Sequence, residues 1–291
     1  MKTINDMPET IARYGPERNA VMFEEQRING RRVLYNDAVL LEIAGKIAYI
    51  TINRPRVLNC INMDVLDELN EIIDVIADNS SVTVIIIKGA GDRAFVSGAD
   101  IRYVGSLDIF GAKKYVEYGQ GILNKLERLK KVVIAAINGY ALGGGCELAL
   151  ACDIRIATAK SKFALPEVCL GMIPGFAGTQ RLPRLVGVGN AKMMMYTGKQ
   201  ITAEKAKEIG LVNEIVEEPE LMNYCRELAE AIIENSQIAV GMAKTSINEG
   251  LQLDLMRGIE HEAAVFAVNF SSADRIEGTR AFMEKRKPNF I

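Results

Sequence analysis

The sequence has a single histidine, His261, and no tryptophan among its 291 residues. An enzyme of the Ser-His-Asp or Cys-His type would depend on that one imidazole, and no Gly-x-Ser-x-Gly motif accompanies it. The sequence around His261 has a helical pattern, so a position on a helix face is the simpler interpretation. We therefore set aside hydrolysis through a catalytic triad.

Cysteines are few, and their spacing suggests no pairing. The chain has five of them, and no two form a Cys-x-x-Cys motif, which indicates free thiols in a reducing compartment. No cluster of residues has the spacing of metal ligands, so we expect neither a bound metal nor a disulfide framework. Cys146 and Cys152 lie in apolar sequence and are predicted to be core thiols rather than nucleophiles.

Long apolar runs are also missing. The first residues contain no apolar segment typical of a secretory signal, and the longest uncharged stretch, Val132 to Cys146, is too short and glycine-rich to cross a bilayer. The net charge is −2, and the one basic cluster, Lys125 to Lys131, is interrupted by Glu127 and Leu129, as on the solvated face of a helix. We expect a soluble, cytoplasmic protein with no membrane or nucleic-acid partner.

Three parts can be distinguished along the chain. Residues 1–38 form an N-terminal extension in which two arms of alternating polarity flank Asn29-Gly30, a strong hairpin signal. Residues 39–220 alternate short apolar runs with segments of helical period, which indicates an α/β core with crossover connections. Residues 221–291 have a helical pattern throughout.

The clearest elements of the core follow one another. A helix is predicted at 63–78, with apolar positions at Val65, Leu66, Leu69, Ile72, Ile73 and Ile76. The apolar run of 82–91 predicts a strand buried on both faces, and a second helix is expected from about 111 to 129. Another buried strand is expected at 132–139, after which a helix should begin.

Three consecutive glycines, Gly143 to Gly145, stand at the start of that helix, directly before Cys146 and Glu147. Glycine allows backbone conformations closed to other residues, and the first turn of a helix leaves N–H groups unpaired at the positive end of its dipole. The turn is neither a P-loop nor a dinucleotide-binding motif. Two interpretations stay open: a site for an oxygen that becomes anionic, or glycines that allow close helix–strand packing.

Two glutamates stand among apolar residues. Glu147 lies in the first turn of the expected helix, and Glu167 follows Pro166 ahead of a glycine-rich segment, residues 171–181, of the kind that wraps a site. Two carboxyl groups in one apolar pocket perturb each other's proton affinity and can divide acid and base roles. Taken singly, each has a structural alternative, because an acid in a first helical turn stabilises the dipole.

A further candidate segment, Ala94 to Val104, follows the first buried strand at its carboxyl end, where α/β proteins place ligand sites. Backbone N–H groups around Gly98, Ala99 and Asp100 could donate hydrogen bonds there. The alternative for Asp100 is that it caps a turn.

Several long motifs occur in one order: "NRPRVLNCIN", "KGAGDRAFVSGADI", "VIAAINGYALGGGCELALACDIRIA", "FALPEVCLGMIPGFAGTQRLPRLVG", "AKEIGLVNEIV" and "FMEKRKPNF". Together they resemble the crotonase (enoyl-CoA hydratase/isomerase) superfamily over about residues 39–291. The resemblance implies an α/β spiral of ββα units, followed by a C-terminal helical region that packs trimers, often paired into hexamers. It also implies acyl-CoA thioester substrates, with coenzyme A as part of the substrate and no separate cofactor.

The resemblance also implies roles for matched residues. The N–H groups of Ala99 and Gly144 would hold the thioester carbonyl, and Glu147 and Glu167 would hold a water between them. One glutamate would act as base on the water attacking C3, and the other as acid toward C2 on the same face. Keeping both favours a hydratase of trans-2-enoyl-CoA that gives (3S)-hydroxyacyl-CoA. The alternatives are an enoyl-CoA isomerase, a dienoyl-CoA hydratase or an RNA-binding member.

Substrate contacts are implied for Arg56, Asp100, Ile101, Arg102, Gly175, Phe266 and Lys285. Arg56 and Lys285 would lie near the nucleotide of coenzyme A, and Lys285 and Phe266 would reach a neighbouring subunit's site. The alternative for Lys285 is a solvated surface side chain. The chain departs from the common pattern at Leu165, where many hydratases have glutamine, and at Ala177, which replaces a glycine.

Overall fold

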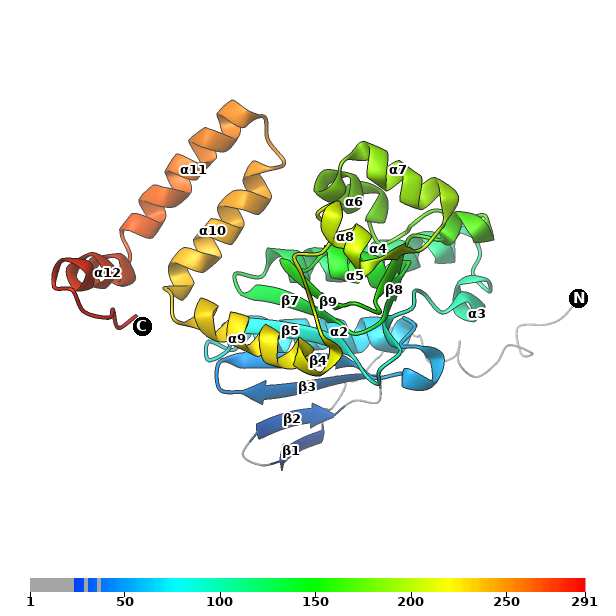
Figure 1. Cartoon of the computed structure of the whole chain (residues 1–291), viewed down its shortest axis with the longest axis horizontal. Coiled ribbons are helices and arrows are strands. Elements are labelled where there is room, and N and C mark those ends of the chain that lie inside the picture. The colour runs from blue at the N-terminus through cyan, green and yellow to red at the C-terminus, as the bar shows by residue number, and fades with distance from the viewer. Residues whose placement is uncertain (1–23, 29–30, 36–37, 291) are drawn as a thin grey trace, which may run out of the picture.

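The computed structural model describes residues 24–28, 31–35 and 38–290, and these contain two β-sheets, one of eight strands and one of four (Figure 1). The larger sheet has, in spatial order, β1 (Glu24–Ile28), β2 (Arg31–Tyr35), β3 (Val39–Ala44), β4 (Ile47–Ile52), β5 (Val84–Gly89), β7 (Val132–Ile137), β9 (Ile154–Thr158) and β12 (Glu214–Val216). Neighbours from β1 to β4 are antiparallel, and neighbours from β4 to β12 are parallel.

Strands of the smaller sheet follow strands of the larger sheet along the chain. Its strands, in spatial order, are β11 (Ile201–Thr202), β10 (Lys162–Ala164), β8 (Tyr140–Leu142) and β6 (Ala94–Val96). Each of β5, β7 and β9 leads within a few residues into β6, β8 or β10, and a helical segment follows. This strand–strand–helix repeat is the predicted ββα unit, and the expected α/β spiral is confirmed.

The helices of the core pack on the two sheets, and most of the C-terminal helices extend away from them. Those of the core are α2 (Met63–Asp78), α3 (Ile101–Val104), α4 (Ile109–Arg128), α5 (Gly144–Leu150), α6 (Gly178–Val186), α7 (Val188–Thr197) and α8 (Ala203–Glu208). The C-terminal ones are α9 (Leu221–Ile233), α10 (Gln237–Gly250), α11 (Leu255–Phe270) and α12 (Ala273–Met283). Figure 1 shows α9 lying across the larger sheet, whereas α10, α11 and α12 project from the body as an arm.

Local sequence explains where the predicted helices begin. The helix expected at 63–78 is α2, its six apolar positions are buried, and the side chain of Asn62 caps it by accepting from the Val65 N–H at 3.1 Å. The helix expected from about 111 begins instead at Ile109, because the Asp108 side chain caps it by accepting from the Gly111 N–H at 2.7 Å. The short helices α3, α6, α7 and α8 were not predicted.

The N-terminal extension contributes strands to the larger sheet. The two arms flanking Asn29-Gly30 are β1 and β2, which pair antiparallel, and β2 pairs with β3. The hairpin prediction is therefore confirmed for the strands. Asn29-Gly30 and the residues before Glu24 lie outside the described part of the chain.

Apolar side chains pack on both faces of the parallel strands. On β5, Ile85 and Ile87 join the main core with α2 and α4, whereas Val84 and Ile86 join a second cluster under α9. The prediction of a strand buried on both faces is confirmed. The core therefore holds the carboxyl ends of the parallel strands, and the loops that leave them, in fixed positions.

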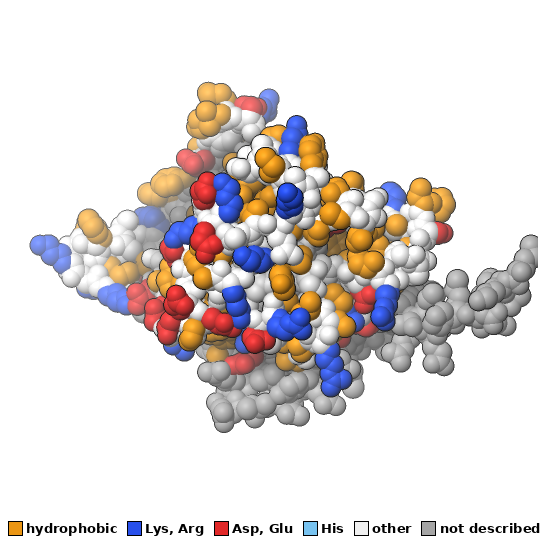
Figure 2. Space-filling view, turned by 45° about the vertical axis from the view of Figure 1, so that its right-hand side comes forward, with side chains coloured by type: hydrophobic (Ala, Val, Ile, Leu, Met, Phe, Trp, Pro, Cys, Tyr) orange, Lys and Arg blue, Asp and Glu red, His pale blue; other side chains and the backbone are white. Residues whose placement is uncertain are grey.

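One buried ion pair ties the arm to the core. Lys244 on α10 donates from Nζ to Asp153 Oδ2 at 2.7 Å and to the Lys131 carbonyl oxygen at 2.9 Å. The same Asp153 oxygen accepts from the Val133 N–H at 2.7 Å, so the carboxylate joins α10 to β7. Figure 2 shows apolar side chains at the tip of the arm, where Leu251, Leu255 and Met256 are exposed.

Lys244→Met should lower the free energy of unfolding by about 3 kcal/mol, because it leaves Asp153 partly buried without its cation. Urea unfolding followed by circular dichroism would measure the change. The matched control is Lys287→Met, since Lys287 pairs with Glu234 in full contact with solvent and its loss should change little. Equal effects of the two substitutions would contradict the anchoring role.

Candidate active site

A cavity of about 560 Å³ opens between the smaller sheet, α4 and α5. Its lining comes from four segments, residues 97–104, 112–116, 143–147 and 166–176. Of the residues predicted for the site, those that line it are Ala99, Ile101, Gly144, Glu147, Glu167 and Gly175. Segments that are far apart in the sequence therefore meet at one place, as the ββα repeat requires.

The glycine turn before α5 bears out the packing interpretation, whereas the anion-site interpretation stays a prediction. Gly143 has φ 49°, a left-handed value that favours glycine, and a Cβ there would lie 2.7 Å from Glu167 Oε1. A Cβ on Gly145 would lie 2.0 Å from the Val96 carbonyl oxygen, so this glycine is needed for helix–strand packing. Gly144 lies between them and lines the cavity. Gly145 thus allows close packing of the helix on the strand, whereas the adjacent Gly144 lies at the cavity.

The backbone N–H groups of Ala99 and Gly144 have no hydrogen-bond partner among the described residues. Ala99 forms a parallel bridge with Ile61, but the bonds run from the Ile61 N–H to the Gly98 carbonyl and from the Asp100 N–H to the Ile61 carbonyl. The Ala99 N–H is left out of that bridge. The Gly144 N–H belongs to the first turn of α5 and has no intrahelical partner. Both residues line the cavity, so their N–H groups are the candidate donors to a ligand oxygen.

The other end of α5 is held by a buried arginine. Arg155 on β9 donates from Nη1 to the Cys152 carbonyl at 2.6 Å and from Nε to the Leu211 carbonyl at 2.8 Å. A longer bond, 3.3 Å, runs from Nη1 to the Ala149 carbonyl. A cation at the carboxyl end of a helix complements its dipole, so Arg155 fixes the helix that carries Glu147.

Glu147 is only 2% exposed, and its Oε1 accepts from the Gly178 N–H at 2.7 Å. Burial raises the pKa of Glu147 to about 8, although the Gly178 hydrogen bond lowers it; the negative charge of Glu167 raises it further. The carboxyl group is therefore protonated over much of the neutral range. Gly178, which the sequence analysis did not single out, is its anchor.

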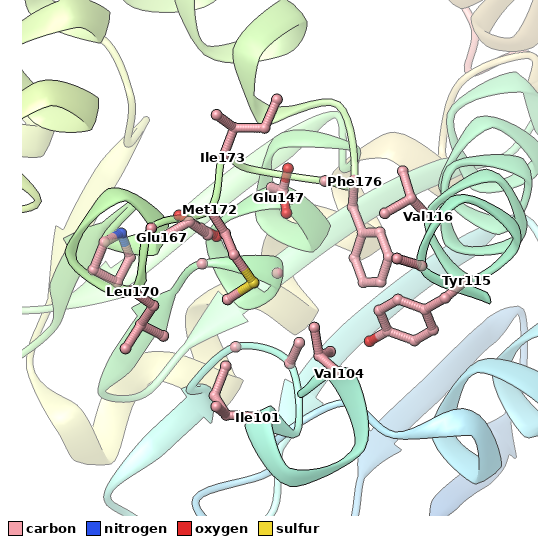
Figure 3. A pocket seen from close by; sticks show the side chains of 18 of the residues that line it. Ile101, Val104, Tyr115, Val116, Glu147, Glu167, Leu170, Met172, Ile173 and Phe176 are labelled. Carbon is pink, nitrogen blue, oxygen red and sulfur yellow. The ribbon is translucent and has the colours of Figure 1, made fainter. Parts of the chain in front are cut away.

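Glu167 begins the short 3₁₀ helix Glu167–Leu170 and faces the same cavity (Figure 3). Burial raises the pKa of Glu167 as well. Its Oε2 is buried and has no hydrogen-bond partner within the described residues. An unpaired carboxylate oxygen beside a second carboxyl group can bind a water or a substrate hydroxyl.

The two departures from the common pattern both lie at Glu147. Leu165 is fully buried, and its Cδ1 is 3.1 Å from the point that a Cβ on Gly178 would occupy, so it forms an apolar wall beside the Glu147 anchor. Ala177 precedes the anchoring N–H and adopts φ 73° and ψ 20°, the left-handed region. A side chain in that conformation is strained by about 1–2 kcal/mol.

Most of the wall opposite Glu167 is apolar. In Figure 3, Tyr115 and Val116 come from α4 on one side and Glu167 and Leu170 from the other, with Glu147 between them. Phe176 packs against Tyr115 with ring centroids 5.3 Å apart. The sequence analysis missed these aromatic residues, although Ala112, Tyr115 and Val116 have the spacing of a single helix face.

The remaining predicted site residues do not line the cavity. Asp100 caps α3 by accepting from the Arg102 N–H at 3.2 Å, and its carboxylate is 3.7 Å from Arg54 Nη2, so the capping alternative is confirmed. Arg56 and Arg102 are exposed. Phe266 lies on α11, and Lys285 follows α12, both in the arm.

Other predictions about single residues also have an outcome. Cys146 and Cys152 are buried core thiols, and His261 lies on α11, as predicted. Lys125 pairs with Asp74 on the neighbouring helix. No group of three His, Cys, Asp or Glu side chains within the described ranges could hold a metal ion. None of the helices in those ranges is long and apolar enough to cross a membrane.

The fold is a ββα spiral, and its apolar cavity is lined by two carboxyl groups and by two residues with unpaired N–H groups. Such a site is suited to polarise a carbonyl group and to move protons beside it. The sequence profile of the enoyl-CoA hydratase/isomerase family matches residues 42–291. The chain belongs to that family.

Close relatives cover almost the whole of this match. The crotonyl-CoA hydratase of Syntrophomonas wolfei is 46% identical over 87% of this chain and 97% of its own. The short-chain-enoyl-CoA hydratase of Clostridium acetobutylicum is 47% identical over 86% of this chain and 95% of its own. The crystal structure of enoyl-CoA hydratase from Bacillus anthracis superposes with a TM-score of 0.84 at 40% identity, over 87% of this chain and 98% of that one.

Ala177→Gly should raise the free energy of unfolding by about 0.5–1 kcal/mol, because relief of the left-handed strain exceeds the added entropy of the unfolded chain. Chemical denaturation of both proteins would measure the difference. Ala231→Gly, at an exposed position of α9, is the control and should have the opposite sign. A loss of stability at both positions would contradict the strain.

The stability of the protein should depend on pH through Glu147. The folded protein keeps this proton up to about pH 8, whereas the unfolded side chain releases it near its ordinary value of 4.5. The folded state thus binds more protons between these values, and the free energy of unfolding falls as pH rises through them. Glu147→Gln should therefore gain on the wild type from pH 5 to pH 8, by an amount on the order of 4 kcal/mol.

Urea titrations of both proteins at pH 5, 6.5 and 8 would measure that gain. Glu117→Gln, an exposed residue of α4, should keep a constant difference from the wild type. A constant difference for Glu147→Gln as well would mean that the native carboxyl group is already ionised at pH 5.

Proposed function

We propose that this chain is an enoyl-CoA hydratase, which adds water syn across the C2–C3 double bond of trans-2-enoyl-CoA to give (3S)-hydroxyacyl-CoA, reversibly. One observation carries the proposal: Glu147, Glu167 and the unpaired N–H groups of Ala99 and Gly144 all face one cavity. The relatives named above as crotonyl-CoA and short-chain-enoyl-CoA hydratases support the substrate class.

The reaction needs an electrophile, a nucleophile and a proton donor in one place. The thioester carbonyl oxygen accepts from the Ala99 and Gly144 N–H groups, and the dipole of α5 adds positive potential there. These donors stabilise the negative charge that develops on the oxygen as water adds to C3. One such donor is typically worth ~10²–10³ in rate.

The two carboxyl groups supply the proton transfers. Burial and their mutual repulsion disfavour ionisation of both at neutral pH, so one is a carboxylate and the other a carboxylic acid. The carboxylate takes a proton from the water as it attacks C3, and the acid gives its proton to C2. The pair ends with its proton exchanged between partners, ready for reversal. Because both carboxyl groups are taken to act on the same face of the double bond, the addition is syn.

Binding of the rest of the substrate and assembly complete the proposal. Ile101 and Gly175, which line the cavity, contact the acyl-CoA there, and Arg56, Asp100 and Arg102 serve as further substrate contacts, Arg56 near the nucleotide of coenzyme A. The exposed apolar arm supports a homotrimer, or a hexamer made of two trimers, in which Phe266 and Lys285 reach the neighbouring subunit's site. Coenzyme A enters as part of the substrate, no further cofactor takes part, and the protein works in the cytoplasm in the β-oxidation of fatty acids.

Purified protein should consume crotonyl-CoA, seen as a loss of absorbance of the conjugated thioester. Glu147→Gln and Glu167→Gln should each lower kcat by at least ~10²-fold, because each removes a proton-transfer group without removing its volume. Glu117→Gln, on the exposed surface of α4, is the matched control and should leave the rate unchanged.

Full activity in either site variant would rule out the two-carboxylate mechanism. Absence of crotonyl-CoA hydration in the wild type, together with tight acyl-CoA binding, would redirect the function to isomerisation or to a dienoyl-CoA substrate. Product chirality, read with a (3S)-specific dehydrogenase, tests the face of addition.

A further inference from the structure

Tyr115 has a polar atom that the proposed reaction does not use. The residue is 6% exposed, and its phenol oxygen is buried without a hydrogen-bond partner within the described residues. Figure 3 shows the ring projecting from α4 into the cavity, with the oxygen on the side of Val104. By contrast, the hydroxyl of Tyr118, on the same helix, bonds to Asp67 at 2.8 Å.

The neighbouring rings hold this hydroxyl in place. The centroid of the Tyr115 ring is 5.4 Å from that of Tyr103, edge to face, and 5.3 Å from that of Phe176. Phe176 is itself fixed, because its ring lies so near α4 that a Cβ on Gly119 would be 2.3 Å away. The hydroxyl cannot swing out to solvent without moving this aromatic stack.

A buried hydroxyl without a partner is unfavourable unless something else supplies a hydrogen bond. Burial raises the pKa of Tyr115, so the phenol keeps its proton and can donate. The cavity offers it little, since its other polar lining side chains in the described part of the chain are Ser97, Glu147 and Glu167. A bound ligand is the natural source of an acceptor.

The volume of the cavity leaves room for such a ligand. An acyl group of four carbons fills on the order of 100 Å³ when each heavy atom takes about the volume of a water molecule. The cavity holds about 560 Å³. The α4 wall, with Ala112, Tyr115 and Val116, lies across the cavity from Glu167, so a longer acyl tail can extend toward it (Figure 3).

We propose that the Tyr115 hydroxyl forms a polar subsite for the acyl tail, and that the preferred substrates are 2-enoyl-CoA thioesters with an uncharged oxygen acceptor beyond C4. The inference rests on the proposed hydratase function and deepens it. Charged tails do not fit, because no lysine or arginine among the described residues lines the cavity and its acidic side chains are Glu147 and Glu167. A carboxylate tail would meet like charge in an apolar setting.

The test compares substrates of equal size. Hept-2-enoyl-CoA is measured beside two analogues in which an ether oxygen replaces the methylene at position 5 or 6, with wild type and Tyr115→Phe. For at least one analogue, the ratio of its kcat/KM to that of hept-2-enoyl-CoA should be about tenfold higher in wild type than in the variant. Tyr118→Phe is the matched control and should keep the wild-type ratio.

The outcomes separate the subsite from the hydratase function. Crotonyl-CoA, whose acyl group ends at C4, reports the hydratase function itself, and the control Tyr118→Phe, whose side chain lies outside the cavity lining, should hydrate it within about twofold as fast as the wild type. Equal ratios in both proteins, or no turnover of the longer thioesters by a wild type that hydrates crotonyl-CoA, would overturn the subsite alone. A tenfold loss on crotonyl-CoA in Tyr115→Phe would also overturn it, since the hydroxyl would then act at the reacting carbons. Failure of the wild type on crotonyl-CoA counts against the proposed function.

Discussion

The hydrogen bond from the Gly178 N–H to Glu147 Oε1 holds an almost fully buried carboxyl group over the cavity, and the surrounding structure preserves that geometry. Burial disfavours the charged form of this carboxyl group, so the group needs a hydrogen-bond donor at a fixed position. The donor and the acceptor belong to two separate units of the spiral, and both units must therefore be held in place. The acceptor, Glu147, lies on α5, and Arg155 binds the carbonyl groups at the carboxyl end of this helix. The donor follows Ala177, whose strained conformation turns the Gly178 N–H into the cavity wall.

Sequence periodicity was sufficient for the elements whose determinants are local. The α2 helix has its six core positions and its Asn62 cap within one continuous stretch, and its bounds could be predicted. The glycine turn before the helix could be predicted from three adjacent glycines, although the sequence left open whether they serve a ligand or helix–strand packing. The two glutamates needed the resemblance as well, since a lone acid in a first turn has a common structural explanation.

Contacts between distant segments could not be predicted in this way. Lys244 and Asp153 are 91 residues apart, and no pattern in the sequence links them. Gly178 holds Glu147 through a backbone N–H, which every residue except proline has, so its identity carries no signal. The packing of Phe176 on Tyr115 depends on the small size of Gly119, an effect that appears only when α4 and the 171–181 segment are brought together. The sequence indicated the two glutamates and the glycine turn at the cavity better than the apolar walls that surround them.

The anchor of the arm has a mechanical meaning. Asp153 lies three residues after the end of α5. Its carboxylate accepts from Lys244 on α10 and from the N–H of Val133 on β7. Lys244 thus links α10 to the segment that follows the helix carrying Glu147, and a second contact runs from the Asn248 side chain on α10 to the Glu127 carbonyl on α4. A displacement of the arm would therefore act on the segment that leaves α5 as well as on β7, so the arm and the spiral core are not mechanically independent.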